Sequence, residues 1–297
     1  MIVDFNKVTI GADPEYFASY KYNDKYFVEP PVIFRKEFNA DSFIAENDFE
    51  ARHPIFIKKD DILIMEDGAA FEYTLPPVKT PKQMYEILDK ADGLLSNFLK
   101  RYGYEFYNKP VINFDLERFN PEKIDDDLWM CMIFGCDEDY DALDDNYKCE
   151  IAEVTSHPFR YGGGHIHYGS KEEDISKTIS EYFKPLVQIS AICVGNTAIK
   201  NSKNPELEIQ RGNYYGKAGR YRIQPHGLEY RSPSNSWTSD KDSIEKIFNA
   251  IEKTFEIFNN PKLGKEIINN YLESTVKAIR FADQNLSETI LNEVGLL

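Results

Sequence analysis

The chain of 297 residues is long enough to bury a large core, in one elaborate domain or in two modest ones. Hydrophobic residues make up 42% of it and aromatic residues 14%, which excludes a disordered tail and predicts a folded globular protein. The formal net charge of −15 argues against direct nucleic-acid binding, because gripping phosphates requires a basic surface. A cationic partner, or carboxylates that hold metal ions, fits this charge better, although acidity also serves solubility alone.

The first part of the chain predicts two strands and one long helix. We expect a strand over 8–18, interrupted early at Pro14, and a second strand over 69–75. The next segment predicts a helix, which Thr80 can cap and Gly103 ends. One face of this helix is an apolar stripe made up of Met84, Ile87, Leu88, Ala91, Leu95, Phe98 and Leu99.

The stretch 120–150 is strongly acidic, and we expect it to form loops and short strands near the surface. Its carboxylates come in three runs, at 125–127, 137–139 and 144–145. The segment could attract a cationic amine, or it could be a solvated insertion without a specific role.

Beyond the acidic stretch, the pattern predicts a strand, a long helix, a strand and a helical tail. These four segments are 165–169, 170–198, 221–232 and 239–295. Ser170 and Glu173 form a capping-box pattern at the start of the long helix, and Pro185 predicts a bend within it. Strands and helices do not alternate regularly, which favours one α+β domain over 1–297 and argues against a parallel Rossmann-type sheet.

The cysteines and the N-terminus favour a cytoplasmic protein. The cysteines lack the spacing of a zinc site and are too few for a disulfide framework in so large a chain. They are Cys131, Cys136, Cys149 and Cys193. The first residues lack the blocks of a signal peptide, and no apolar run approaches the length of a membrane span. We therefore expect the protein to work in a cytoplasm and to have no membrane partner.

Chemically reactive side chains recur on four predicted strands, mostly two residues apart. They are Asp13 and Glu15, Glu72 between Ala70 and Thr74, His165 and His167, and Glu229 and Arg231. Side chains of a strand alternate between faces, so both members of each pair point the same way. One face of the sheet would carry carboxylates, imidazoles and a guanidinium group, and the other would be apolar. Burying so much charge is costly unless metal ions or charged ligands neutralise it.

Each of these elements also has a plainer explanation. Asp13 and Glu15 could be a solvated strand face, and Glu72 an exposed strand residue. The Glu229–Arg231 pair could be a cross-strand ion pair and no more. Two histidines on one face behind a glycine turn are harder to explain in that way, and the joint occurrence of all four elements favours a functional site. No Gly-Lys-Ser/Thr follows the glycines, which excludes a Walker-type loop.

Six segments of the chain also occur in an order that is known from one protein family. They are 11–17 (Gly-Ala-Asp-Pro-Glu-Tyr-Phe), 67–77 (Asp-Gly leading to Glu and Pro-Pro), 135–137 (Gly-Cys-Asp), 163–167 (Gly-Gly-His-Ile-His), 216–222 (Gly-Lys-Ala-Gly-Arg-Tyr-Arg) and 229–237 (Glu-Tyr-Arg-Ser-Pro-Ser-Asn-Ser-Trp). Together they resemble the phage-associated carboxylate–amine ligases of the glutamine synthetase-like superfamily. The resemblance covers 11–237, most of the chain, and leaves the helical region 239–297 unmatched.

The resemblance implies an antiparallel sheet curved into half a barrel, with helices packed on its convex face. Its concave face would hold ATP, the substrates, and two or three Mg²⁺ ions, with Mn²⁺ as an alternative. By similarity, Glu15 and Glu72 would bind one ion. A second ion would be held by Asp13, His165 and Glu229. The shorter Asp13 stands where glutamine synthetase has a Glu.

Further residues take roles in the implied chemistry. Arg231, Arg222 and Arg220 would meet the transferred phosphoryl group and the acyl phosphate, since a guanidinium binds such anions through two hydrogen bonds. Asp67 would either accept the proton of the attacking amine or bind its ammonium form. The nucleotide phosphates would lie near His167 and the backbone of Gly163 and Gly164.

The implied reaction joins a carboxylate to an amine. ATP would activate the carboxylate, which could be glutamate-like, as an acyl phosphate, and an amine of unknown identity would attack it to form an amide. The superfamily often assembles into larger particles, so the resemblance also allows a homo-oligomer. The alternatives are a phosphotransferase of the same superfamily, like the guanidino kinases, a metal-assisted hydrolase, and a non-catalytic protein with an acidic binding face. The arginines would have no role in the last two alternatives, the hydrolase and the non-catalytic protein.

Overall fold

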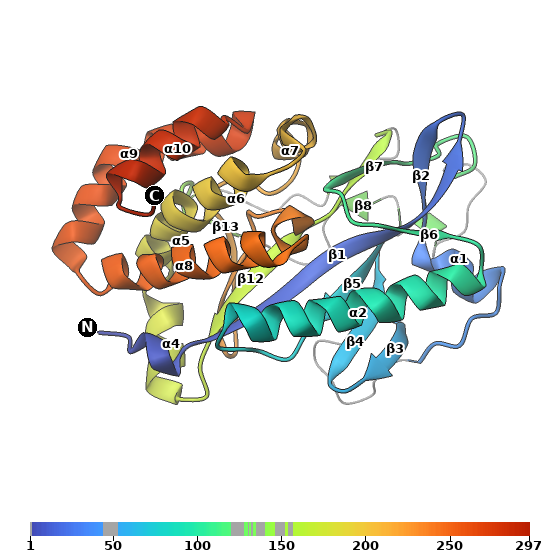
Figure 1. The fold of residues 1–297 in the computed structure, drawn as a ribbon, viewed down its shortest axis with the longest axis horizontal. Coiled ribbons are helices and arrows are strands. Elements are labelled where there is room, and N and C mark those ends of the chain that lie inside the picture. Colours follow the sequence, from blue (N-terminus) through green and yellow to red (C-terminus); the bar gives the residue numbers. More distant parts are fainter. Residues whose placement is uncertain are drawn as a thin grey trace.

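The fold is α+β and is built around one large, mostly antiparallel sheet, which confirms this part of the sequence-based expectation (Figure 1). The structure is a computed structural model that describes residues 2–43, 53–119, 128–129, 131, 133–134, 140–145, 152–153 and 157–297. Its strands are β1 (Thr9–Tyr22), β2 (Lys25–Glu29), β3 (Ile55–Lys59), β4 (Ile62–Asp67), β5 (Ala70–Thr74), β6 (Glu105–Tyr107), β7 (Val111–Asn113), β8 (Ile133–Phe134), β9 (Tyr140–Asp141), β10 (Ala152–Glu153), β11 (Phe159–Tyr161), β12 (Gly164–Gly169), β13 (Arg220–Gln224) and β14 (Gly227–Tyr230). Its helices are α1 (Pro31–Lys36), α2 (Pro81–Arg101), α4 (Glu173–Glu181), α5 (Phe183–Ser190), α6 (Asn196–Asn201), α7 (Pro205–Gly212), α8 (Lys241–Phe258), α9 (Pro261–Phe281) and α10 (Gln284–Glu293), with short helical segments at Phe5–Lys7, Ala191–Gly195 and Asn235–Thr238.

The long strand β1 organises the sheet, because β2, β5, β6 and β12 all pair with it. Across the sheet the strand order is β11-β7-β2-β1-β12-β14-β13-β9, and β5 attaches β4 and β3 to β1. Among the described residues, only the short β2–β7 contact is parallel. The sheet is open, since no pairing joins its two end strands in the described part of the chain.

The predicted interruption of the first strand at Pro14 is wrong, because β1 runs unbroken over Thr9–Tyr22. Pro14 is the last residue of β1 that pairs with β12, and Glu15 is the first that pairs with β5. The missing N–H of the proline therefore falls where the strand changes partner, and the cost to the sheet is small.

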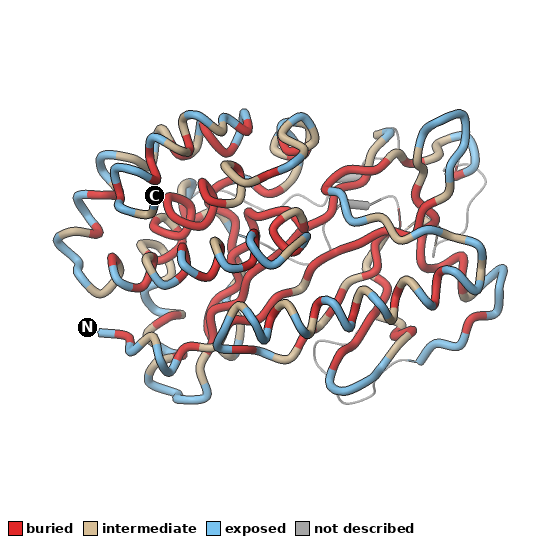
Figure 2. Tube along the Cα trace, in the orientation of Figure 1, coloured by how far each residue is buried: buried red, intermediate tan, exposed pale blue. Residues whose placement is uncertain are grey.

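One face of the sheet is apolar and covered by helices. Its central strands bury Ala12, Tyr16, Ile166, Tyr168 and Tyr230. These side chains belong to one hydrophobic cluster with the apolar residues of α2, α5 and α8. Figure 2 shows the same layering, with buried strands behind helices whose outer turns are exposed. The opposite face is thereby left to the polar side chains that alternate with these residues.

The first predicted helix is confirmed as α2. Thr80 and Gln83 form a capping box at its start, and the helix ends at Arg101. Gly103 then turns the chain with φ at +82°, a conformation that glycine adopts without strain.

The second predicted helix is divided. It breaks at Tyr182, between α4 and α5, because Pro185 has no N–H to donate to the carbonyl of Glu181. The predicted capping box is wrong, since the hydroxyl of Ser170 donates to the carbonyl of Lys7 and the helix begins after Glu172 without a side-chain cap.

The remaining predictions have mixed outcomes. The single strand expected over 221–232 is wrong, because the chain turns back at Pro225 and His226 and forms the β13–β14 hairpin, with Gln224 paired to Gly227. The helical tail is confirmed as α8, α9 and α10, and α7 was not expected. In the acidic stretch, two strands of two residues are described, β8 and β9, as anticipated. The carboxylate runs 125–127 and 137–139, the segment 135–137, and Cys149 lie outside the described residues.

Candidate active site

The reactive side chains singled out in the sequence share one face of neighbouring strands. Asp13 of β1 lies opposite His165 of β12. His167, further along β12, lies opposite Glu229 of β14. Because directly opposed residues of an antiparallel pair point to the same side, this register continues one polar face across three strands.

A group of three carboxylates, called here the tricarboxylate group, consists of Glu15, Asp67 and Glu72. Glu15 and Glu72 are opposed on β1 and β5, and Asp67 ends β4 just before the turn at Gly68. One oxygen from each of the three lies within 4.8 Å of the others. Gly68 has φ at +52°, and this left-handed turn lets the hairpin bring Asp67 beside Glu72.

Burial and the repulsion of neighbouring carboxylates raise the pKa values of Glu15 and Glu72. Burial, followed by the charge of Asp67, raises the pKa of Glu15 to about 7. The pKa of Glu72 lies well above its usual range, first because of burial and then because of Asp67 and Asp13. A divalent cation among these oxygens would relieve the repulsion, and an all-carboxylate set fits Mg²⁺ or Mn²⁺.

A second cluster, the histidine group, consists of Asp13, His167 and Glu229, with ligand atoms within 4.8 Å of one another. His167 Nε2 contacts the carboxylate of Asp13, and its Nδ1 lies 3.0 Å from His226 Nε2. Burial opposes ionisation of Glu229, yet Arg231 and a hydrogen bond from His165 hold its pKa well below the usual range. An ionised carboxylate is therefore maintained inside the sheet face.

The grouping of the two histidines differs from the one that the family resemblance implies. His167, not His165, completes the histidine group. His165 lies between the two groups, with Nδ1 3.3 Å from Glu229 Oε1 and Nε2 3.8 Å from Glu15 Oε1. Burial, and then the charge of Arg231, lowers the pKa of His165 to about 4, so its imidazole is neutral at neutral pH.

Two of the three arginines face the histidine group. Arg231 is buried and contacts Glu229 Oε1. Arg222 Nη1 lies 3.5 Å from Glu229 Oε2. Arg220 lies two residues before Arg222 on β13, and its Nε is 3.9 Å from Asp141 Oδ2 on β9. Guanidinium groups thus border the carboxylates on the β13–β14 side.

The glycine turn before β12 lies tightly against the site. The amide of Gly163 donates to Glu15 Oε2 at 2.6 Å. A Cβ atom on Gly163 would lie 2.5 Å from His165 Nε2, and one on Gly162 would lie 2.7 Å from the side-chain nitrogen Nδ2 of Asn235. Glycine is needed at both positions because neighbouring side chains already occupy the space that a side chain there would fill.

Replacing Gly164 by Ala is expected to lower the free energy of unfolding by about 1–3 kcal/mol. The new methyl group would lie 2.3 Å from the backbone oxygen of Ser234, which cannot rotate away. Gly93 provides the control, since a Cβ there meets nothing within 4 Å, and Gly93→Ala in α2 is expected to stabilise the protein by about 0.5–1 kcal/mol. Urea unfolding of both variants checks this, and equal changes in the two would contradict it.

Sequence reasoning missed three residues of the site, namely Arg211, Tyr215 and His226. The buried guanidinium of Arg211, at the end of α7, donates to three backbone carbonyls that flank the site, those of Gly162, Ser232 and Pro233. No spacing along a strand indicates Arg211 or Tyr215, because both come from the α7 end and its following turn. His226 lies in the β13–β14 turn, at a position where the sequence predicted a continuous strand.

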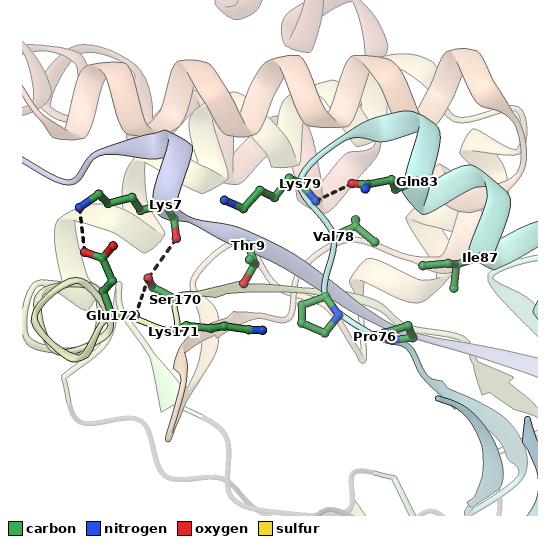
Figure 3. Close-up of a pocket in the computed structure, with 11 residues that line it drawn as sticks. Lys7, Thr9, Pro76, Val78, Lys79, Gln83, Ile87, Ser170, Lys171 and Glu172 are labelled. Carbon is green, nitrogen blue, oxygen red and sulfur yellow. Dashed lines mark hydrogen bonds and ion pairs between the residues drawn. The ribbon is translucent and has the colours of Figure 1, made fainter. Parts of the chain in front are cut away.

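A cleft of about 230 Å³ leads away from the histidine group. It begins at Asp13 and His167 and passes Gly11 and Gly169 to Lys171. Thr9, Pro77, Ser170 and Lys171 also line a larger groove of about 760 Å³. Figure 3 shows the side chain of Lys171 extending in the direction of Pro76, with Lys7 and Lys79 among the other residues that line the groove. The polar face therefore continues into a cleft and a groove that are both lined by Lys171, whose ammonium group is positively charged.

No protein-family model matches the chain, and no curated protein matches it. Among the helices of the described residues, none has the length and apolar character that crossing a membrane requires. The functional argument consequently rests on the geometry of the polar face.

Proposed function

We propose that the protein is an ATP-dependent carboxylate–amine ligase that forms an amide through an acyl phosphate. The observation that carries this proposal is the arrangement of two groups of metal-ligand type, with Arg231 and Arg222 beside the second one, on one sheet face. Carboxylates in this number favour cations, and adjacent arginines favour an anion that the cations also bind. A nucleotide triphosphate meets both requirements.

The tricarboxylate group and the histidine group are the proposed cation sites. Glu15, Asp67 and Glu72 supply only oxygen ligands, which suits Mg²⁺, and His167 adds an imidazole that Mn²⁺ also accepts. Bound ions would supply charge neutralisation for the phosphate oxygens of ATP. The raised pKa values of Glu15 and Glu72 support this assignment, because cation binding offsets the repulsion that causes them.

Arg231 and Arg222 are proposed to bind the phosphoryl group as it moves from ATP to the carboxylate. Both now contact Glu229, and a guanidinium retains further N–H donors for a planar anion. They would align the attacking carboxylate oxygen with the γ-phosphorus and stabilise the charge that develops between them.

The cleft that starts at Asp13 and His167 is the proposed place of the nucleotide. Its phosphates would lie at the histidine group, and its base would lie outward near Leu75 and Pro77, which line the same cleft. Lys171, which lines both the cleft and the groove, carries a positive charge toward this path (Figure 3).

Amine attack completes the proposed reaction. Glu15 is buried, while Glu72 and Asp67 are both partly exposed, and of these two it is Asp67 that lies at a strand end, next to the Gly68 turn. We assign it the role of accepting the proton of the amine. The free amine then attacks the acyl carbon, the amide bond forms, and phosphate leaves with the former carboxylate oxygen.

Oxygen-18 transfer tests this reaction and separates it from its rivals. The protein is incubated with ATP, Mg²⁺, a pool of amines, and carboxylic acids labelled with oxygen-18 in the carboxyl group. A ligase releases phosphate that carries one labelled oxygen from the acid. Phosphate without label would contradict the proposal and favour hydrolysis, and a phosphorylated guanidine in the pool would favour a phosphotransferase.

A further inference from the structure

The ring of Tyr215 is held at the edge of the polar face by the end of α7. The backbone N–H of Tyr215 donates to the carbonyl of Arg211 at 2.8 Å, and the guanidinium carbon of Arg211 lies 5.0 Å from the ring centroid. Gly216 follows with φ at +70°, and a Cβ there would lie 2.1 Å from a guanidinium nitrogen of Arg211. The turn is thus built so that the tyrosine points toward the site.

The hydroxyl of Tyr215 lies among three residues of the site. It is 3.1 Å from His165 Nε2, 3.3 Å from Glu15 Oε1 and 3.4 Å from Arg231 Nη2. Arg231 can only donate, so the phenolic oxygen accepts from it. A neutral His165 has one N–H, and with Nδ1 donating to Glu229 its Nε2 accepts the O–H of Tyr215. Oε1 of Glu15 lies 3.3 Å from the same hydroxyl. One hydroxyl therefore contacts residues from three strands or their ends.

These contacts connect the two proposed cation sites. Glu15 belongs to the tricarboxylate group, and His165 contacts Glu229 of the histidine group through its other nitrogen at 3.3 Å. The path from Glu15 through Tyr215 and His165 to Glu229 consists of largely buried side chains whose polar atoms lie 3.1–3.3 Å apart. Among the described residues, no other hydroxyl group contacts both Glu15 and His165.

We propose that Tyr215 is a positioning residue shared by the two cation sites, and this rests on the proposed function only in requiring that both sites bind cations. Its hydroxyl lies against the carboxylate of Glu15, and by donating to Nε2 of His165 it keeps the proton of that imidazole on Nδ1, where it faces Glu229. Residues that orient metal ligands in this way typically contribute about 10- to 100-fold in metal affinity. Because one hydroxyl serves both groups, its removal weakens both sites together.

Mn²⁺ binding to Tyr215→Phe tests the proposal without any knowledge of the substrates. Free Mn²⁺ is followed by electron paramagnetic resonance while the ion is titrated into wild-type protein and variants. Tyr214→Phe is the matched control, since Tyr214 is the adjacent tyrosine, is 57% exposed, and packs on His157 and Tyr161 outside the polar face. Thermal unfolding of each metal-free variant is recorded beside the titrations.

The expected result is two Mn²⁺ sites in the wild type and in Tyr214→Phe, and about 10- to 100-fold weaker binding at both sites in Tyr215→Phe with little change in melting temperature. Weakening of one site alone, or of neither, would overturn the shared role of Tyr215 while leaving the cation sites in place. Absence of Mn²⁺ binding to the wild type would remove the cation sites of the proposed function, and the inference with them.

Discussion

Replacing Glu72 by Gln is expected to stabilise the metal-free protein at pH 8 by about 1–3 kcal/mol and to abolish cation binding at the tricarboxylate group. The pKa of Glu72 lies well above its ordinary value of 4.5, mainly through burial and then through Asp67. The folded protein therefore holds this proton more tightly than the unfolded chain. The amide of Gln removes the repulsive charge and can donate a hydrogen bond to Asp67.

The pH dependence of stability determines the direction of the change expected for Glu72→Gln. A raised pKa means that the wild-type carboxylate destabilises the folded state above the folded-state pKa and ceases to do so below about pH 4.5. The difference in unfolding free energy between Glu72→Gln and wild type should therefore be largest at high pH and vanish toward pH 4.5. Urea unfolding across this range, without divalent ions, measures it.

Added Mn²⁺ should reverse the ranking, because it stabilises only a protein that binds it. The wild type should gain melting temperature with increasing Mn²⁺, and Glu72→Gln should gain less. Glu86→Gln is the control, since Glu86 lies exposed on α2 and neither stability nor the response to Mn²⁺ should change. A variant that is less stable than the wild type at pH 8 would show that the carboxylate of Glu72 stabilises the metal-free protein, contrary to this prediction.

Replacing Arg231 by Lys is expected to lower the rate of ATP-dependent product formation by about 100- to 1,000-fold while the protein remains folded. The lysine keeps a positive charge beside Glu229, so the buried carboxylate is not left without a partner. It loses the planar pair of donors that a phosphoryl group in transfer requires. Phosphate release in the presence of carboxylate and amine measures the change.

The control for this variant is Arg280→Lys in α9, where the guanidinium packs on Phe281 away from the site. Its activity should equal that of the wild type. Melting temperatures of both variants establish that they fold. An Arg231→Lys variant with more than about a third of wild-type activity would exclude Arg231 from phosphoryl transfer, because losing a transition-state donor costs far more than that.

Much of the polar face could be predicted because a strand has a fixed period of two. That period places Asp13 with Glu15 and His165 with His167, and antiparallel pairing then brings β1, β5, β12 and β14 together. The α+β class follows from the irregular order of strands and helices. The helix α2 follows from its stripe and its Thr80 cap, which act within a single segment.

Other features depend on distant parts of the chain, and local patterns do not contain them. Pro14 is accommodated because β1 changes partner there, which no property of the strand itself reveals. Tyr215 and Arg211 reach the site from the end of a helix, so their contribution depends on how α7 packs. Which of His165 and His167 groups with Asp13 and Glu229 depends on side-chain reach across the sheet, since both share one strand face.

The most direct test is a search for a new amide. The wild type, Glu72→Gln and Arg231→Lys are each incubated with Mg²⁺ and a pool of amino acids, dicarboxylic acids and polyamines, with and without ATP, and the products are weighed by mass spectrometry. The account predicts a mass equal to one acid plus one amine minus water, formed only with ATP by the wild type and strongly reduced in both variants. Failure of the wild type to bind ATP in the presence of Mg²⁺ would contradict the account.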